Sequence, residues 1–121
     1  MEKVDVTWKI FSMYMLIILL LLLCSTAKAQ MQLVVFNAEW NDQNDVRNWA
    51  FNMEDIDTYS YVDINNQKEM QKKHKIAVIP TIIIFKDDEE VARFQADLSF
   101  KMLAKREDVQ EEINNQLMSD F

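Results

Sequence analysis

Apolar and polar positions follow two different periods along the chain, and these periods predict four strands and three helices. Strands are expected at residues 32–36, 59–64, 81–85 and 91–102, where β-branched and aromatic residues form short runs or alternate with polar ones. Helices are expected at residues 42–55, 67–74 and 105–119, where apolar residues recur at helical spacing. Because strands and helices alternate until a final hairpin, the pattern predicts an α/β fold with a mixed sheet whose first three strands pair in parallel where they adjoin.

The only proline of the chain, Pro80, stands directly before the third expected strand. Proline has no N–H to give to a sheet, so it belongs at the first residue of a strand. Residues 81–85 form a run that is too short for a helix and rich in β-branched side chains, so we expect a strand buried on both faces. The charged residues 86–90 then predict a hairpin turn, which has to form without glycine because the chain contains none.

The segment at residues 91–102 has two interpretations. Its strict alternation predicts one long strand with a kink near Asp97. A helix that begins at Ser99 is the alternative. In the strand interpretation, one face carries Phe94, Ala96, Leu98, Phe100 and Met102.

Caps and buried faces define the expected helices. Asn41 or Asp42 is expected to cap the first of them, because a side-chain oxygen at that position accepts from an unpaired backbone N–H. Trp49 and Met53 are most simply core residues of the same helix. The inward-facing positions of the two later helices are expected to be Met70, Val109, Ile113 and Leu117.

A block without charge occupies residues 10–24 near the N-terminus. It is shorter than the roughly 20 apolar residues that span a bilayer, and it fits the apolar region of a signal peptide. Ala27 and Ala29 follow at the spacing of a cleavage site, so residues 1–29 are interpreted as a signal peptide and residues 30–121 as the domain. An uncleaved membrane anchor is the alternative, because acidic residues offset the lysines that precede the block.

Composition excludes several kinds of site. The net charge of −7 argues against nucleic acid as a partner. Phosphate loops rich in glycine are excluded, since the chain has no glycine. The single cysteine, Cys24, lies in the N-terminal block, so the domain has no disulfide and no thiolate metal site. The single histidine, His74, has no partner at ligand spacing, and neither a metal nor a cofactor is expected.

Three stretches, in this order, resemble the thioredoxin superfamily. Residues 33–40 (LVVFNAEW) are similar to the strand that leads into the active site. Residues 61–81 are similar to the second strand, the helix after it and the cis-proline loop, and residues 82–94 to the final hairpin. The resemblance implies a minimal thioredoxin-like fold, a four-stranded mixed sheet with three helices, preceded here by a hydrophobic leader helix. It also implies a cis bond between Ile79 and Pro80.

The resemblance also shows what is missing from the chemistry of that family. Where thioredoxins carry two cysteines after the tryptophan that matches Trp40, this chain carries Asn41 and Asn44. The buried acid of the family falls at Val35. Disulfide exchange requires a thiolate that attacks sulfur, so no catalytic residue is expected and the domain is predicted to be redox-inactive.

Three functional hypotheses follow. The first is an exported domain, periplasmic or extracellular, that binds a protein or an extended peptide in a groove formed by Trp40, Asn41, Asn44, Ile79 and Pro80. Against it stands a purely structural interpretation, in which the proline sets a loop and the asparagines are ordinary caps. The second hypothesis is an accessory subunit of a larger assembly, held at a membrane only through residues 10–24 if these remain. The third, a thiol–disulfide oxidoreductase, is the least favoured.

Overall fold

The structure, a computed structural model, describes residues 2–25 and 28–119, with side chains over residues 6–21 and 28–119. After helix α1 (Glu2–Ser25) come β1 (Met31–Asn37), a 3₁₀ helix η1 (Glu39–Asn44), α2 (Arg47–Ala50), β2 (Thr58–Asp63) and α3 (Lys68–Lys73). The chain continues through β3 (Thr81–Lys86), β4 (Glu89–Gln95) and α4 (Arg106–Met118).

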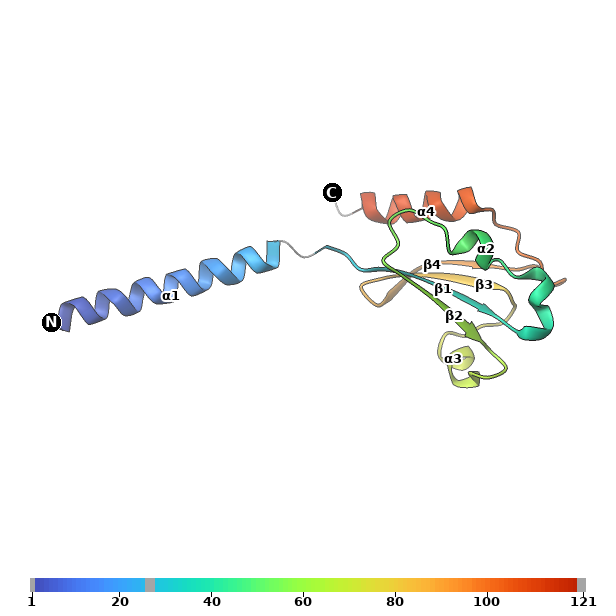
Figure 1. The fold of residues 1–121 in the computed structure, drawn as a ribbon, viewed down its shortest axis with the longest axis horizontal. Coiled ribbons are helices and arrows are strands. Elements are labelled where there is room, and N and C mark those ends of the chain that lie inside the picture. The colour runs from blue at the N-terminus through green and yellow to red at the C-terminus, as the bar shows by residue number, and fades with distance from the viewer. Residues whose placement is uncertain (1, 26–27, 120–121) are drawn as a thin grey trace.

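The four strands form one mixed sheet in the order β2-β1-β3-β4. Strands β1 and β2 are parallel, whereas β3 is antiparallel to both β1 and β4. The expected parallel pairing is therefore confirmed for the first two strands and wrong for the third, because the chain after α3 enters β3 in the direction opposite to β1. Helices α2 and α4 cover one face of the sheet and α3 covers the other (Figure 1). The expected α/β fold with a mixed four-stranded sheet is therefore confirmed.

Two apolar clusters, one on each face, hold this sheet together. On the face of α2 and α4, Val109 and Ile113 of α4 pack on β1 and β3. On the face of α3, Phe36 of β1 and Ile83 of β3 are fully buried, with Met70 of α3 packed partly buried against their cluster. Side chains of a strand alternate between the two faces, so a continuous apolar run such as residues 82–85 supplies both clusters. This is why the central strands read as uninterrupted β-branched runs in the sequence.

The helix expected at residues 42–55 is wrong in its extent. It forms as two short pieces, η1 and α2, and Asp45 between them is extended with ψ of 139°. The Asp45 carboxylate accepts hydrogen bonds from the backbone N–H of Arg47 at 3.0 Å and from its guanidinium at 2.7 Å. Such a local bond competes with helix hydrogen bonding. The expected cap at Asn41 or Asp42 is also wrong, since no side-chain cap bond forms at the start of η1.

The long strand expected at residues 91–102 ends instead at Gln95, and the alternative helix from Ser99 begins only at Arg106. Only an isolated bridge between Ala96 and Met102 continues the pairing. The Asp97 carboxylate accepts from the N–H groups of Ser99 and Lys101, at 2.8 and 3.1 Å, which folds residues 97–101 into a loop.

The hairpin between β3 and β4 turns at Asp87 and Asp88, whose φ angles are 51° and 67°. Two consecutive positive φ angles are typical of a type I′ turn, which is usually built with glycine or asparagine. Aspartate tolerates this region better than most residues with a Cβ atom. The turn therefore forms without glycine, as the sequence requires.

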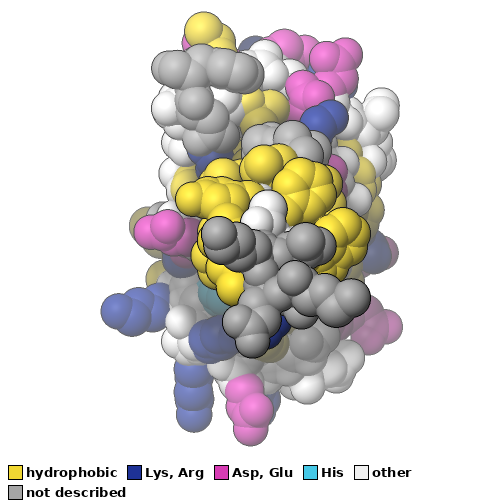
Figure 2. Space-filling view, turned by 90° about the vertical axis from the view of Figure 1, so that its left-hand side faces the viewer, with side chains coloured by type: hydrophobic (Ala, Val, Ile, Leu, Met, Phe, Trp, Pro, Cys, Tyr) yellow, Lys and Arg dark blue, Asp and Glu magenta, His cyan; other side chains and the backbone are white. Residues whose placement is uncertain are grey.

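Helix α1 extends away from the sheet domain (Figure 1). Its described large apolar residues are exposed, with exposed fractions between 45 % at Ile17 and 70 % at Trp8. Figure 2 faces the N-terminal end of α1 and shows hydrophobic side chains gathered around it. Among the residues that the structure describes, no helix has the length and apolar character needed to cross a membrane.

Candidate functional site

The candidate site lies at one end of the sheet, where β1 ends and β3 begins. Phe36 of β1 pairs with Thr81 of β3, so the residues that follow Phe36 stand opposite those that precede Thr81. Ala38 and Ile79 accordingly belong to the same buried cluster. The η1 turn, which carries Trp40, therefore starts beside the Ile79–Pro80 peptide.

The Ile79–Pro80 bond is cis, as the resemblance to thioredoxins implies. Ile79 as a whole residue is 3 % exposed, and the Pro80 carbonyl accepts from the Ala96 N–H at 3.0 Å. Thr81 closes the loop by donating its hydroxyl to the Val78 carbonyl at 2.7 Å. Within the described chain, neither the N–H nor the C=O of Ile79 has a hydrogen-bond partner.

Trp40 is the most prominent side chain of this end of the sheet. It is 54 % exposed, and its ring meets that of Phe100 edge-on, with ring centres 5.2 Å apart and an angle of 87° between the planes. Phe100 is 39 % exposed and Leu98, in the same loop, is 90 % exposed. We call these three residues the Trp40 surface.

Beneath the Trp40 surface lies a network of three asparagines, Asn37, Asn41 and Asn44. The Asn41 amide donates to Asn37 Oδ1 at 3.1 Å and to the Phe100 carbonyl at 3.4 Å. Asn44 donates to Asn41 Oδ1 at 2.8 Å, and Asn37 donates to the Asn41 carbonyl at 3.4 Å. Asn37 and Asn41 are buried, at 0 % and 1 % exposure. The network ties the end of β1, the η1 turn and the loop at Phe100 together.

The loop that presents Phe100 is held by the carboxylate of Asp97. Besides the two backbone bonds already described, Asp97 accepts the Ser99 hydroxyl at 2.6 Å. The hydrogen bond from this hydroxyl, followed by that from the Lys101 N–H, lowers the pKa of Asp97 below its ordinary value. Phe100 has a φ of 65°, which turns the chain so that its ring meets Trp40.

Charges beside η1 form a second small network. The Arg47 guanidinium pairs with Asp45, lies 3.7 Å from an oxygen of Asp42, and stands 3.9 Å from the centre of the Tyr61 ring. The hydrogen bond to Asp45 raises the pKa of Arg47, and burial raises the pKa of Tyr61. These contacts fix η1 over the sheet without creating a group poised for proton transfer.

His74 lies on the opposite face of the sheet, away from the α2 and α4 side. Its ring packs between Phe36 and Phe85, with ring centres 5.5 and 5.4 Å away. Burial, and then the charge of Lys73, lower the pKa of His74 below its ordinary value. Across the described residues there is no group of three or more His, Cys, Asp or Glu side chains placed to hold a metal ion.

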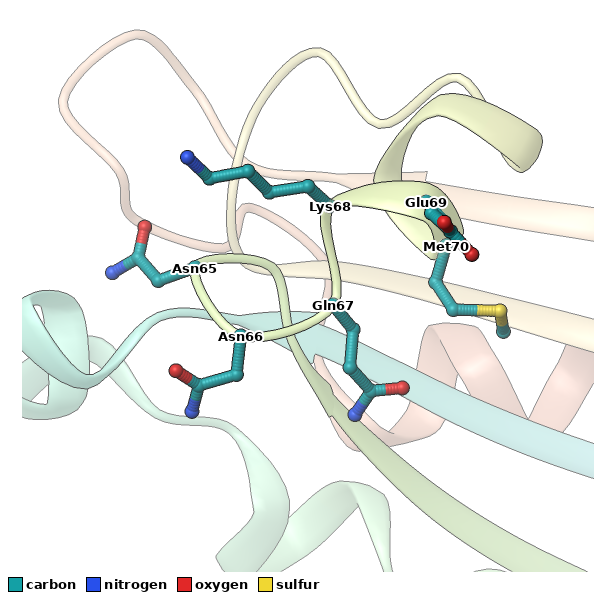
Figure 3. Close-up of a pocket in the computed structure, with 6 residues that line it drawn as sticks. All are labelled: Asn65, Asn66, Gln67, Lys68, Glu69 and Met70. Atoms are coloured by element: carbon teal, nitrogen blue, oxygen red, sulfur yellow. The ribbon is translucent and has the colours of Figure 1, made fainter.

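A hollow of about 420 Å³ lies at the turn between β2 and α3. It is lined by Asn65, Asn66, Gln67, Lys68, Glu69 and Met70, whose side chains spread outward around the turn (Figure 3). The turn is at the same end of the sheet as the asparagine network, because the Ile64 N–H donates to the Asn37 carbonyl at 3.0 Å. The side chains that line the hollow do not converge on one point, so they do not form a binding site for a small molecule.

The five residues expected to bind a peptide occupy different environments. Trp40 is exposed, Asn41 is buried within the network, and Asn44 is partly buried and bonded to Asn41. Ile79 and Pro80 are buried side chains in a loop with unpaired backbone groups. The sequence interpretation placed Leu98 and Phe100 on the apolar face of an expected strand rather than in the groove, and it missed Asn37. The available signal for the network was the presence of three asparagines within residues 37–44, at the end of an expected strand.

No protein-family model and no curated protein sequence matches the chain. Solved structures do match. A mutant thioredoxin from Halobacterium salinarum is 19 % identical, with a TM-score of 0.55 over 73 % of this chain and 75 % of that one. A thioredoxin from Nicotiana alata is 18 % identical, with a TM-score of 0.53 over 71 % and 72 % of the two chains.

The oxidised thioredoxin of Plasmodium falciparum matches in the same way, at 17 % identity and a TM-score of 0.51 over 73 % of this chain and 82 % of that one. At these identities the matches establish the fold. The sheet domain is thus thioredoxin-like, and the sequence carries no pair of cysteines that could form the redox motif of that fold.

Proposed function

We propose that this chain is a redox-inactive thioredoxin-like domain that is exported and binds a protein or an extended peptide at the Trp40 surface and the adjoining Ile79–Pro80 loop. The observation that carries the proposal is the exposed aromatic pair of Trp40 and Phe100, beside the almost fully exposed Leu98. Outside α1, the other described exposed large apolar residues are only Leu103 and Met118. Exposed apolar groups that gather in one place are typical of interaction sites.

The backbone of Ile79 supports the same proposal. Its unpaired N–H and C=O lie beside η1 and can pair with an extended chain, as in recognition by strand addition. Main-chain bonds of this kind give affinity for many sequences, whereas the aromatic side chains select apolar ones. The site therefore suits an extended segment with at least one large apolar side chain.

Redox inactivity rests on the residues at the two cysteine positions. Asn41 and Asn44 have no thiol, and their amides are engaged in the internal network. Val35, at the position of the buried acid, is 0 % exposed and has no proton to give. The chain's single cysteine cannot form an intramolecular disulfide. We expect no reduction of insulin disulfides by the chain.

Binding is tested with a library of extended synthetic peptides on the full-length chain, by isothermal titration calorimetry. Trp40→Ala and Phe100→Ala are expected to weaken the tightest peptide at least tenfold, since aromatic anchors of interfaces contribute about 2 kcal/mol or more. Met118→Ala, which removes an exposed apolar side chain at the end of α4, is the matched control. Unchanged affinity in both aromatic variants would remove the Trp40 surface from the proposal.

Export is proposed from the N-terminal block, and the start of the sheet domain supports it. The Gln30 N–H donates to Asp87 Oδ1 at 2.9 Å, and the Gln30 carbonyl accepts from the Asp87 N–H at 2.9 Å. Cleavage after Ala29 would leave Gln30 as the first residue, with its new amino group already beside a carboxylate. The expected intact mass of the exported protein is that of residues 30–121. A mass of the full chain would instead indicate a retained anchor.

An accessory role in a membrane-associated assembly is the second candidate, and the exposed apolar side chains of α1 favour it. In that case residues 1–29 would remain attached. The chain would then co-sediment with membranes, and deletion of the N-terminal block would release it without loss of the fold. The two candidates therefore differ in a single measurement, the mass of the mature protein.

A further inference from the structure

Strand β2 lies at one edge of the sheet and, within the described chain, pairs only with β1. The Ile64 N–H points at β1, where it donates to the Asn37 carbonyl. Because backbone groups alternate in direction along a strand, the even-numbered residues of β2 face β1 and the odd-numbered ones face outward. The N–H and C=O groups of Tyr59 and Tyr61 and the N–H of Asp63 therefore form an unpaired outer edge.

The opposite edge of the sheet is protected and the β2 edge is not. Strand β4 begins with Glu89 and Glu90, and Arg93 follows, ion-paired with Glu90 at 2.7 Å. Its pairing with β3 is also interrupted by a register shift at Ile84 and Phe85. Charges and bulges of this kind prevent another strand from adding to an edge. In β2, by contrast, residues 58–62 (TYSYV) are uncharged and strongly β-forming.

Two carboxylates flank this uncharged stretch. Asp57 precedes it and lies outside the alternation of β2, since its N–H donates to the Met31 carbonyl at 2.9 Å and its carboxylate accepts from the Met31 N–H at 2.8 Å. Asp63 ends it and accepts from the Asn65 N–H at 2.9 Å. Neither carboxylate has an ion-pair partner among the described residues. The edge thus has an uncharged centre and a negative charge at each end, six residues apart.

We propose that the β2 edge is a second docking site, which adds an extended antiparallel strand from another protein with Lys or Arg at both ends. The site is independent of the Trp40 surface. Opposite charges on facing residues of paired strands stabilise the pair, and like charges destabilise it. The partner strand therefore carries basic residues opposite Asp57 and Asp63 and β-branched residues opposite Tyr59 and Tyr61.

A second copy of this chain is a poor occupant by the same reasoning. Antiparallel self-pairing that uses the outward groups of both Tyr59 and Tyr61 sets these two residues opposite each other across the pair. That register also places Asp57 of each copy directly against Asp63 of the other. Two pairs of like charges then destabilise the dimer, and the two chains also repel each other because each has a net charge of −7.

The test uses the full-length chain in mild detergent and the peptide Lys-Thr-Val-Thr-Val-Thr-Lys. N-methylation of the two valines removes the donors that face β2, whereas N-methylation of the second and third threonines alters donors that face away. We expect binding of the parent and of the threonine-methylated peptide, and loss of binding for the valine-methylated one. The same peptide with Glu at both ends is expected not to bind.

Charge is tested on the chain with the pair Asp57→Asn and Asp63→Asn, which keeps an oxygen for each backbone N–H. This variant is expected to bind the basic peptide on the order of tenfold more weakly, as two exposed ion pairs would give. The matched control, Glu107→Gln with Glu111→Gln, removes two exposed carboxylates of α4 and is expected to bind as the natural chain does.

Three results would overturn the proposal. They are equal binding of both methylated peptides, unchanged binding in the Asp57 and Asp63 variant, and a dimer of the free chain that the peptide dissociates, which would assign the edge to a second copy. Trp40→Ala is expected to leave this binding unchanged, so failure here and failure at the Trp40 surface can be told apart.

Discussion

Trp40 and Asn41 are neighbours in the sequence, yet the first is 54 % exposed and the second 1 %. Trp40 belongs to an apolar surface that faces solvent, and Asn41 belongs to a polar network that is internal to the fold. Asn41 is therefore part of the structural core of the domain. Of the two neighbours, Trp40 is the one that is exposed for contact with another molecule.

The two regions meet at Phe100. Its carbonyl accepts from the Asn41 amide at 3.4 Å, and its ring packs edge-on against Trp40. The network therefore positions the surface. This arrangement predicts that changes in the network alter stability first, whereas changes in the surface alter binding with little effect on stability.

The largest effect on stability is expected from Asn41→Ala. It removes the amide that joins Asn37, Asn44 and the Phe100 carbonyl. Since each buried polar group left without a partner costs about 1–3 kcal/mol, the free energy of unfolding should fall by about 2–4 kcal/mol in urea titrations. Gln43→Ala, an exposed position of the same turn, is the control. Equal losses in the two variants would show that the network does not stabilise the fold.

A smaller effect on stability is expected from Trp40→Ala. The aromatic pair contributes roughly 0.5–1.5 kcal/mol, and half of the Trp40 side chain is already in solvent. The free energy of unfolding should therefore fall by about 1 kcal/mol, while peptide affinity falls at least tenfold. A loss of stability as large as that of Asn41→Ala would mean that the tryptophan is a core residue rather than a contact residue.

The smallest effect is a pH dependence of the loop that carries Phe100. The pKa of Asp97 is lowered in the folded chain, chiefly by the Ser99 hydroxyl. The contribution of the charged form is therefore complete above the ordinary pKa of an aspartate, about 3.9. It is lost as the pH falls through the lower pKa of the folded state.

We expect the amide resonances of Ser99 and Lys101 to shift in that acidic range, while the side-chain amides of Asn37 and Asn41, which do not titrate, stay unchanged. The titration is followed by NMR, with Asp97→Asn as the control that has no carboxylate. Parallel shifts in the network and in the loop would show that the two regions are not separable.

The strands were predictable because their signal is strong and local. Residues 81–85 are apolar on both faces and follow a proline, and the sequence permits few other interpretations. The buried face of the last helix was predictable for the same reason, since Val109 and Ile113 recur at helical spacing, and both are fully buried in the structure. The likeness to thioredoxins added the cis-proline loop, which the residues alone do not specify.

The breaks in these elements were not predictable from apolar periodicity. Asp45, Asp63 and Asp97 each accept a bond from the N–H two residues later, and each ends or interrupts a regular element. Two of these bonds divided an expected helix and shortened an expected strand. The exposure of Phe100 and the burial of Asn41 follow from those breaks, so the composition of the site could not be read from the sequence pattern.

Among the described residues, five adopt positive φ angles and none of them is glycine, namely Asp55, Lys75, Asp87, Asp88 and Phe100. Left-handed backbone costs an ordinary residue about 1–2 kcal/mol, a penalty that glycine avoids. Lys75 is exposed, and its carbonyl, which accepts from Arg93, would survive substitution. The absence of glycine at these positions therefore lowers the thermal stability of the chain. Lys75→Gly should raise its melting temperature, because the relief exceeds the added freedom of the unfolded chain, about 0.5–1 kcal/mol.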